Sequence, residues 1–154
     1  MTDKYSITTY CSADGEYVAE HMREMDAFEC RAAGFATPLE AIQQGFEMST
    51  NMKTGSYNGV PLCVWGEVPD TCGGAVIWQL GTDEVKHHKR AFMVESKKVI
   101  ESMLTEYEYL TNVVCLENKE SVRWLKWLGA QFQEETAMIM GKPFARFYIE
   151  RSEG

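Results

Sequence analysis

Long apolar runs, paired metal-binding cysteines and clustered positive charge are all scarce in this sequence of 154 residues. No apolar run approaches the roughly 18 residues of a membrane span, and no basic segment followed by an apolar one opens the chain. We therefore expect neither a membrane segment nor a signal peptide. The formal net charge of −8 argues against general nucleic-acid binding, because neutralising phosphates requires clustered cations.

The five cysteines are widely spaced, and no C-x-x-C pair occurs. The adjacent residues His87 and His88 have no ligand partner at the spacing of a zinc site. We therefore expect no metal, and reduced, mostly buried thiols in a reducing cytosol. The motifs G-x-S-x-G, the P-loop and H-E-x-x-H are also absent, so the sequence offers no support for the chemistries that they carry.

What the sequence does contain is suited to a packed core: 45% of its residues are hydrophobic, 12% aromatic and 25% charged. A chain of this length typically folds as one domain and buries about two thirds of its surface. No repeat, low-complexity tract or Pro/Gly/Ser-rich linker divides it. We therefore expect a single domain over residues 1–154.

The first third of the chain predicts one strand and two helices. Alternating residues favour a strand over Tyr5–Tyr10, and apolar residues at helical spacing favour one helix over Ala13–Ala33. Thr37-Pro38-Leu39-Glu40 is typical of a helix start, with Thr37 as the cap and Glu40 reaching back. The expected buried stripe of this second helix is Leu39, Ile42 and Phe46.

Strands dominate the middle of the chain. Asn58-Gly59 is a strong hairpin signal, followed by a strand over Val60–Gly66. A second turn leads to the apolar strand Ala75–Leu80. Thr82 then caps a long helical pattern that continues to Tyr107.

The last third alternates between strands and one helix. Val113–Leu116 is short and wholly apolar, as in the middle of a sheet. Asn118 caps a helix over Lys119–Leu128, which Gly129 ends. Two strands close the chain, around Gln131–Met140 and Phe144–Arg151, with Gly141 and Pro143 in the turn between them.

This order of elements is similar to that of the GNAT N-acetyltransferases, whose α/β (α+β) fold has a mixed, mostly antiparallel sheet, a splayed parallel strand pair and flanking helices. Residues 118–132 resemble the GNAT segment that begins with asparagine, runs through a short helix and leaves through glycine into a strand. In that family the asparagine and helix lie beside the coenzyme A arm. The resemblance thus implies that Asn118 contacts acetyl-coenzyme A, whereas the plainer interpretation makes it a helix cap alone.

Two departures from the GNAT pattern bear on activity. Many GNAT enzymes carry, seven residues after that asparagine, a tyrosine that protonates the leaving thiolate, and Leu125 occupies this position. Their phosphate-binding loop also contains spaced glycines, which let backbone N–H groups approach the pyrophosphate. The equivalent segment here has no glycine after Gly81.

This segment instead carries a basic run in an otherwise acidic protein: Lys86, His87, His88, Lys89 and Arg90. Cations at a helix start are unfavourable unless an anion is bound, so the basic run could clamp a pyrophosphate in place of glycine amides. The alternative is a solvated helix turn, for which Asp83 and Glu84 supply the capping charge. Both interpretations remain open.

Glu67, at the end of the strand Val60–Gly66, is the carboxylate best placed to deprotonate an amine through water. A narrower resemblance, to the GNAT-like internal virion protein A family of autographivirus-type podophages, rests on residues 32–34, 59–62 and 82–85 and on residues 123–130 running into Glu134-Glu135. It implies a phage protein in the host cytoplasm, where it takes part in particle morphogenesis or host takeover. Two functions are therefore expected: an acetyl-coenzyme A-dependent transferase acting on a host or phage amine, or a non-catalytic scaffold that binds a host or phage protein.

Overall fold

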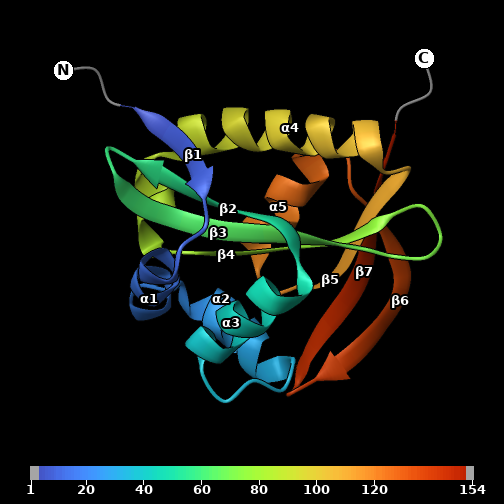
Figure 1. The fold of residues 1–154 in the computed structure, drawn as a ribbon. Coiled ribbons are helices and arrows are strands. Elements are labelled where there is room, and N and C mark those ends of the chain that lie inside the picture. Colours follow the sequence, from blue (N-terminus) through green and yellow to red (C-terminus); the bar gives the residue numbers. More distant parts are fainter. Residues whose placement is uncertain (1–3, 152–154) are drawn as a thin grey trace. The chain divides into compact units, whose positions relative to one another are not determined.

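The computed structural model describes residues 4–151, which form seven strands and six helical segments (Figure 1). In chain order these are β1 (Tyr5–Thr9), α1 (Ser12–Glu20), α2 (Glu24–Ala32), α3 (Pro38–Met48), β2 (Thr50–Tyr57), β3 (Val60–Pro69), β4 (Ala75–Gly81), the 3-10 helix η1 (Asp83–His87), α4 (Lys89–Glu106), β5 (Tyr109–Cys115), α5 (Lys119–Trp127), β6 (Gln131–Ile139) and β7 (Lys142–Glu150). No helix within these residues is long and apolar enough to cross a membrane.

The strands form one sheet in the order β1-β2-β3-β4-β5-β7-β6. The β1–β2, β2–β3, β5–β7 and β6–β7 pairs are antiparallel, whereas β4 and β5 are parallel. The parallel register covers Ala75 and Val76 alone, opposite Leu110 and Thr111, so the pairing ends soon after β4 begins. The crossover helix α4 makes this parallel arrangement possible. The predicted fold class, with its parallel pair, is confirmed.

The chain divides into two compact units. Unit 1 runs to Val68 and includes the return segment Trp78–Phe92, and unit 2 comprises Pro69–Ile77 and the chain from Met93 onward. Both β4 and α4 therefore contribute residues to each unit. The single domain over residues 1–154 stays a prediction.

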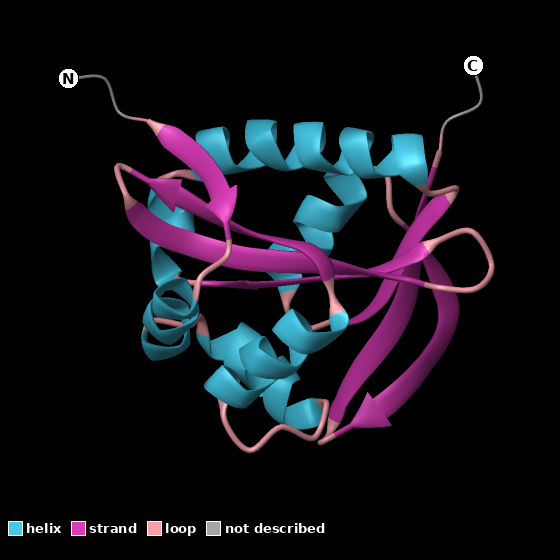
Figure 2. Ribbon diagram, viewed as in Figure 1, coloured by secondary structure: helices cyan, strands magenta, loops and turns pink. Residues whose placement is uncertain are grey.

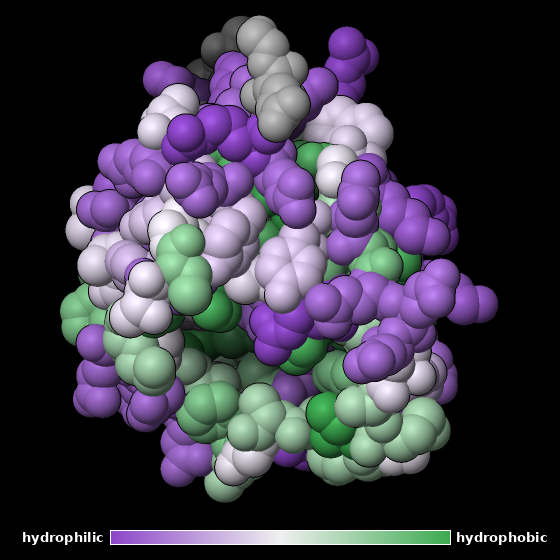
Figure 3. All heavy atoms as spheres, turned by 90° about the vertical axis from the view of Figure 1, so that its right-hand side faces the viewer, coloured by the Kyte–Doolittle hydropathy of each residue, from purple (hydrophilic) through white to green (hydrophobic). Residues whose placement is uncertain are grey.

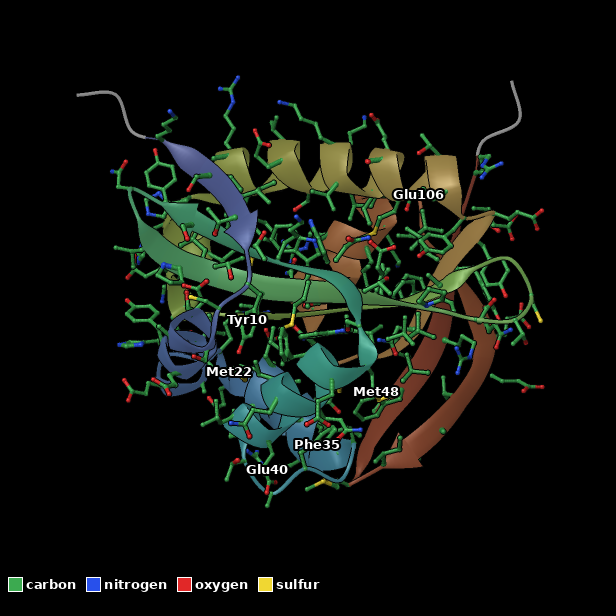
Figure 4. The ribbon with its side chains drawn as sticks, viewed as in Figure 1. Tyr10, Met22, Phe35, Glu40, Met48 and Glu106 are labelled. Carbon is green, nitrogen blue, oxygen red and sulfur yellow. The ribbon has the colours of Figure 1, made fainter. Side chains whose placement is uncertain are left out.

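In unit 1, helices α1 and α3 pack on β2 and β3 (Figure 2). The buried centre of this packing consists of Val18, Ile42, Met52 and Val64. Half-buried side chains surround it, among them Tyr10 and Met22, whose places beside the helices can be followed in Figure 4. Burial of apolar area is worth about 25 cal/mol per Å², so this cluster stabilises the packing of the helices on the strands in unit 1.

Unit 2 has its core on β5 and β7, which pair along their whole length from Tyr109 opposite Glu150 to Cys115 opposite Phe144. Alternate residues of β7 are buried, as expected of a strand with one covered face. The helices contribute further buried side chains, namely Ile100 and Met103 from α4 and Leu125 from α5.

The helix predicted over Ala13–Ala33 is wrong, because the chain leaves the helical path at His21–Arg23 and forms two helices, α1 and α2. Backbone groups at the break pair with a distant segment instead. The amide of Arg23 donates to the carbonyl of Gly81 (3.0 Å), and the amide of Asp83 donates to the carbonyl of His21 (3.3 Å). These long-range bonds replace the helical bonds that the break removes.

The start of α3 follows the prediction. The amide of Glu40 donates to Thr37 Oγ1 (3.2 Å), and Glu40 Oε2 accepts from the amide of Ala36 (3.0 Å). The expected buried stripe is only partly right, since Ile42 is fully buried but Phe46 is 55% exposed. The ring of Phe46 lies against Tyr10 at a centroid distance of 5.3 Å, on the surface of unit 1.

Two hairpin turns have the same left-handed backbone. Asn58 and Gly59 have φ of 50° and 81°, and Met140 and Gly141 have φ of 51° and 78°. Positive φ at both central residues is typical of the type I′ turn that joins twisted strands. The first turn confirms the prediction, whereas Pro143 lies within β7 and not in the second turn.

Candidate functional site

The basic run follows β4 and spans two helical segments of unit 1. Lys86 and His87 end η1, and Lys89 and Arg90 begin α4. These four side chains are exposed. His88, between the two segments, is half-buried and stacks on the ring of Tyr57 at a centroid distance of 3.8 Å. The structure therefore keeps the basic run together along one stretch of surface.

Two backbone amides of this segment are engaged in local hydrogen bonds. The amide of Val85 donates to the carbonyl of Thr82 (3.3 Å), and the amide of His88 donates to the carbonyl of Val85 (3.0 Å). Both N–H groups are thus engaged inside the 3-10 turn. Residues 82–91 also contain no glycine, the residue that lets a ligand approach the backbone most closely. The exposed cations of the basic run and the first-turn amides of α4, which have no partner within the helix, remain to contact an anion.

Thr82 stands at the N-cap position of η1, as predicted, but its side chain does not cap the helix. It is fully buried, and Oγ1 has no hydrogen-bond partner among the described residues. Its backbone is fixed by its amide, which donates to the carbonyl of Leu62 (2.8 Å), and by an isolated bridge to Met22. Long-range backbone pairing, not capping, therefore positions Thr82.

Glu67 lies near the end of β3, opposite Thr50 in the β2–β3 register. Its side chain is only 5% exposed, and Oε2 has no partner among the residues that the structure describes. A buried carboxylate oxygen without a hydrogen bond is costly, and natural proteins retain few of them. Such an oxygen can accept a proton or a hydrogen bond, which is what the predicted base requires, although Glu67 is buried and not open to solvent.

Asn118 belongs to unit 2 and directly precedes α5. It is 1% exposed, and its carbonyl accepts from the amide of Val122 (3.0 Å) as the helix begins. The predicted side-chain cap is absent, because Asn118 makes no side-chain hydrogen bond to the first turn of α5. Its position is therefore as predicted and its capping contact is not.

Leu125, which occupies the tyrosine position, is buried at 4% exposure. The end of α5 is fixed by Gly129, with φ of 98°, and by the amide of Ala130, which donates to the carbonyl of Leu125 (2.9 Å). A hydrocarbon side chain in a packed core has no proton to give. The position where many GNAT enzymes hold a proton donor thus serves packing here.

Sequence reasoning missed Asp26, a buried acid in the first turn of α2. Asp26 Oδ1 forms an ion pair with Arg23 (3.0 Å), and Oδ2 accepts from the amide of Gly81 (2.8 Å). This carboxylate ties α2 to the end of β4, just before η1. Nothing local marks it, because its partner Gly81 is 55 positions away in sequence.

No group of three or more His, Cys, Asp or Glu residues within the described chain could hold a metal ion. The five cysteines are all free, with Cys30, Cys63 and Cys115 buried and Cys11 and Cys72 exposed. Burial raises the pKa of the Cys30 and Cys63 thiols to about 12. These two thiols are therefore protonated and inert at neutral pH.

The fold is that of the GNAT acetyltransferases, as comparison with solved structures shows. A chimera of Vibrio cholerae spermidine N-acetyltransferase SpeG with hSSAT has a TM-score of 0.70 at 10% identity, over 95% of each chain. The aminoglycoside acetyltransferase AAC(6')-Ib in complex with coenzyme A has a TM-score of 0.67 at 14% identity, over 96% of this chain and 95% of that one. Identities this low establish the shared fold only.

Sequence comparison then gives the family. Residues 51–137 match the family described as bacteriophage T7, probable scaffold protein Gp13. The probable scaffold protein gp13 of Escherichia phage T7 is 31% identical over 113 residues, which are 71% of this chain and 74% of that protein. This chain belongs to that family. The family is thus the phage scaffold family, and not the internal virion protein A family that the sequence resemblance implied.

Proposed function

We propose that this protein is a non-catalytic scaffold of GNAT fold, which binds another protein during phage particle assembly in the host cytoplasm. The observation that carries the proposal is the 3-10 segment η1. It follows β4, where the GNAT enzymes that this chain resembles have the glycine loop that holds a pyrophosphate. The amides of Val85 and His88 are engaged within η1, so these two backbone donors are not available to a cofactor phosphate. Membership of the gp13 family, whose T7 member is named a probable scaffold protein, supports the same function.

Leu125 supports the proposal independently. A transferase gains rate from a group that protonates the leaving thiolate, and general acid catalysis typically contributes about 10²–10⁴-fold. The buried hydrocarbon of Leu125 offers no such group. This chain therefore lacks both the glycine loop and the proton donor of the enzymes that it resembles. What it retains is the shape and the surface of the fold, which is what a scaffold needs.

A second candidate function is acetyl-coenzyme A-dependent transfer to a host or phage amine. The partnerless Oε2 of Glu67 favours it, because a buried carboxylate can hold the proton that an attacking amine releases. Exposed cations of the basic run, among them Lys89 and Arg90, would contact the pyrophosphate. The thioester of the bound cofactor would supply the acyl group.

A thermal-shift titration with acetyl-coenzyme A separates the two functions. A ligand present at 100 times its dissociation constant stabilises a protein by about 2.7 kcal/mol, which is roughly 5–10 °C in melting temperature for a chain of this size. The scaffold proposal expects no shift at millimolar cofactor. A shift that disappears in the double variant Lys89→Ala/Arg90→Ala, together with release of free coenzyme A thiol in the presence of an amine, would overturn it.

A phage experiment tests the scaffold function directly. Glu67→Gln combined with Lys89→Ala and Arg90→Ala removes the base and two of the phosphate-binding cations of the transferase candidate. If the protein acts as a scaffold, phage carrying this triple variant should give particle yields equal to wild type, measured as plaque-forming units per infected cell. Truncation of the protein within the β5 strand serves as the control, and it should lower the yield. A triple variant that behaves like the truncation, although it folds with normal circular dichroism, would contradict the proposal.

A further inference from the structure

The β6 strand at the end of the sheet is open on three sides. Among residues 4–151, β6 pairs with β7 alone, so no strand of this range neighbours its outer edge. Residues 133–138 are all exposed, and neighbouring residues of a strand face opposite sides of the sheet. Neither face of this part of β6 is therefore covered.

The pairing of β6 with β7 is also interrupted. The register moves from Phe132 opposite Phe147 to Thr136 opposite Ala145, so residues 133–135 face only Arg146 across the ladder. This irregularity leaves Glu134 and Glu135 in a bulge. Neither glutamate forms an ion pair or a side-chain hydrogen bond with any other residue in the described range 4–151, and the Arg146 guanidinium instead donates to Thr111 Oγ1 (3.2 Å).

Beyond the acidic bulge the surface becomes apolar. Met138 and Met140 are 67% and 56% exposed, at the end of β6 and in the turn that follows. Figure 3 faces the side that carries β6 and β7, and hydrophobic side chains (green) are exposed on it. Flexible methionine side chains suit surfaces that adapt to a partner.

We propose that the β6 edge, defined as Gln133–Met140, binds an extended, positively charged segment of another protein by strand addition. An unpaired edge offers its backbone N–H and C=O groups to an added strand, and side-chain pockets or charges then select the partner. Lysine or arginine side chains on the added strand would face Glu134 and Glu135, and an apolar residue would cover Met138. This inference rests on the proposed scaffold function and gives it a surface and a partner chemistry.

Charge argues against a second copy of this chain as the occupant. A twofold antiparallel pairing centred on β6 would set Glu134 and Glu135 against the same residues of the other copy. Like charges directly opposite each other across a strand pair are destabilising. The net charge of −8 adds a general repulsion between copies.

The probe is a synthetic peptide of alternating lysine and valine, labelled for fluorescence anisotropy and used with the full chain at low salt. Two control peptides are matched in length: one replaces lysine by glutamate, and one places proline at the central positions and so cannot complete a ladder. We expect binding of the lysine peptide alone. Hydrogen exchange followed by mass spectrometry should show slower exchange in peptides from β6 and no change in those from α4.

Charge reversal at the bulge is the decisive variant. Glu134→Lys/Glu135→Lys should weaken binding by about tenfold or more, because it turns the attraction into repulsion. The matched control Glu101→Lys/Glu106→Lys makes the same change in net charge at exposed positions of α4, one of which, Glu106, is labelled in Figure 4. It should bind within about twofold of wild type, since rim and distant charges contribute little.

Three results would overturn the proposal: no binding of the lysine peptide, equal loss in the two charge variants, or a concentration-dependent dimer in sedimentation that the bulge variants alter. None of these bears on acetyl-coenzyme A, so the thermal-shift result is judged separately. A chain that binds neither the peptide nor the cofactor would keep the scaffold function and lose this surface. A chain that turns over the cofactor would lose the scaffold function itself.

Discussion

Replacing Leu125 with alanine tests whether α5 is held by packing at the position of the missing proton donor. Leu125 is 4% exposed, so the change removes buried methyl groups and leaves a cavity. Such substitutions cost about 2–5 kcal/mol, and the cost falls where the surroundings can collapse into the space. Because α5 has only nine residues and ends soon after Leu125, partial collapse is expected, which puts the cost at about 2–3.5 kcal/mol.

Urea denaturation followed by circular dichroism measures this loss. The midpoint should fall while the slope of free energy against urea stays constant, which marks a change in stability and not in the surface exposed on unfolding. The melting temperature should drop by about 4–14 °C, at roughly 2–4 °C per kcal/mol for a chain of this size. Val94→Ala is the control, since Val94 is 46% exposed on α4 and its loss should change stability by less than about 0.5 kcal/mol.

Leu125→Tyr tests whether the side chain at this position is packed in the core or faces an open site where a tyrosine could act as proton donor. In a filled core the larger ring should cost about 1–3 kcal/mol through overpacking, and no acetyl transfer should appear. If Leu125→Ala costs less than about 1 kcal/mol and the tyrosine variant is as stable as wild type, the side chain faces open space. The argument against a proton donor at this position would then fail.

Three further predictions concern a close contact of Gly45, the reactivity of the cysteines and one hydrogen bond. Gly45→Ala should lower the melting temperature, because the added Cβ would lie 2.5 Å from the Trp78 ring. Alanine favours helices more than glycine does, so propensity alone predicts the opposite sign. Gln43→Ala, on the exposed side of α3, is the control. Iodoacetamide at pH 8 should label the two exposed cysteines and spare the three buried ones until denaturant is added; mass spectrometry that finds a buried thiol labelled first would refute this. Tyr109 donates its hydroxyl to Asp70, which lowers the pKa of that carboxyl and raises the pKa of Tyr109 to about 12. The stability from this bond should therefore be lost as pH falls through the lowered pKa of Asp70, or as it rises from about 10 towards 12, and Tyr109→Phe should flatten both limbs of a pH–stability curve.

The sequence predicted well those features that a few neighbouring residues determine. The capped start of α3 at Thr37, the hairpin at Asn58-Gly59 and the end of α5 at Gly129 all have the expected geometry. In each case the decisive interaction lies within four residues of the signal. The order of these elements was then sufficient to indicate the GNAT fold, because few topologies place a parallel crossover after an antiparallel meander.

The features that the sequence missed depend on distant partners. The helix predicted over Ala13–Ala33 breaks because Arg23 bonds to Gly81, a residue that no local pattern connects with it. Asn118 is a common capping residue, yet its side chain makes no capping bond, and its burial of 99% is a tertiary effect. Local propensity cannot reveal which buried polar group finds its partner across the fold.

The 3-10 helix η1 divides the basic run into two parts with different electrostatic surroundings. If Lys86 and His87 opened α4, they would lie at the positive end of a long helix and would need an anion. Instead they end η1, a position that favours cations, and Asp83 and Glu84 occupy its first turn, which favours acids. The charge order of η1 therefore matches its own weak dipole, and only Lys89 and Arg90 remain at the start of α4. For Lys86 and His87 the solvated turn is therefore the simpler account, whereas Lys89 and Arg90 lie at the positive end of α4 without an acid in its first turn, where a bound anion would stabilise them.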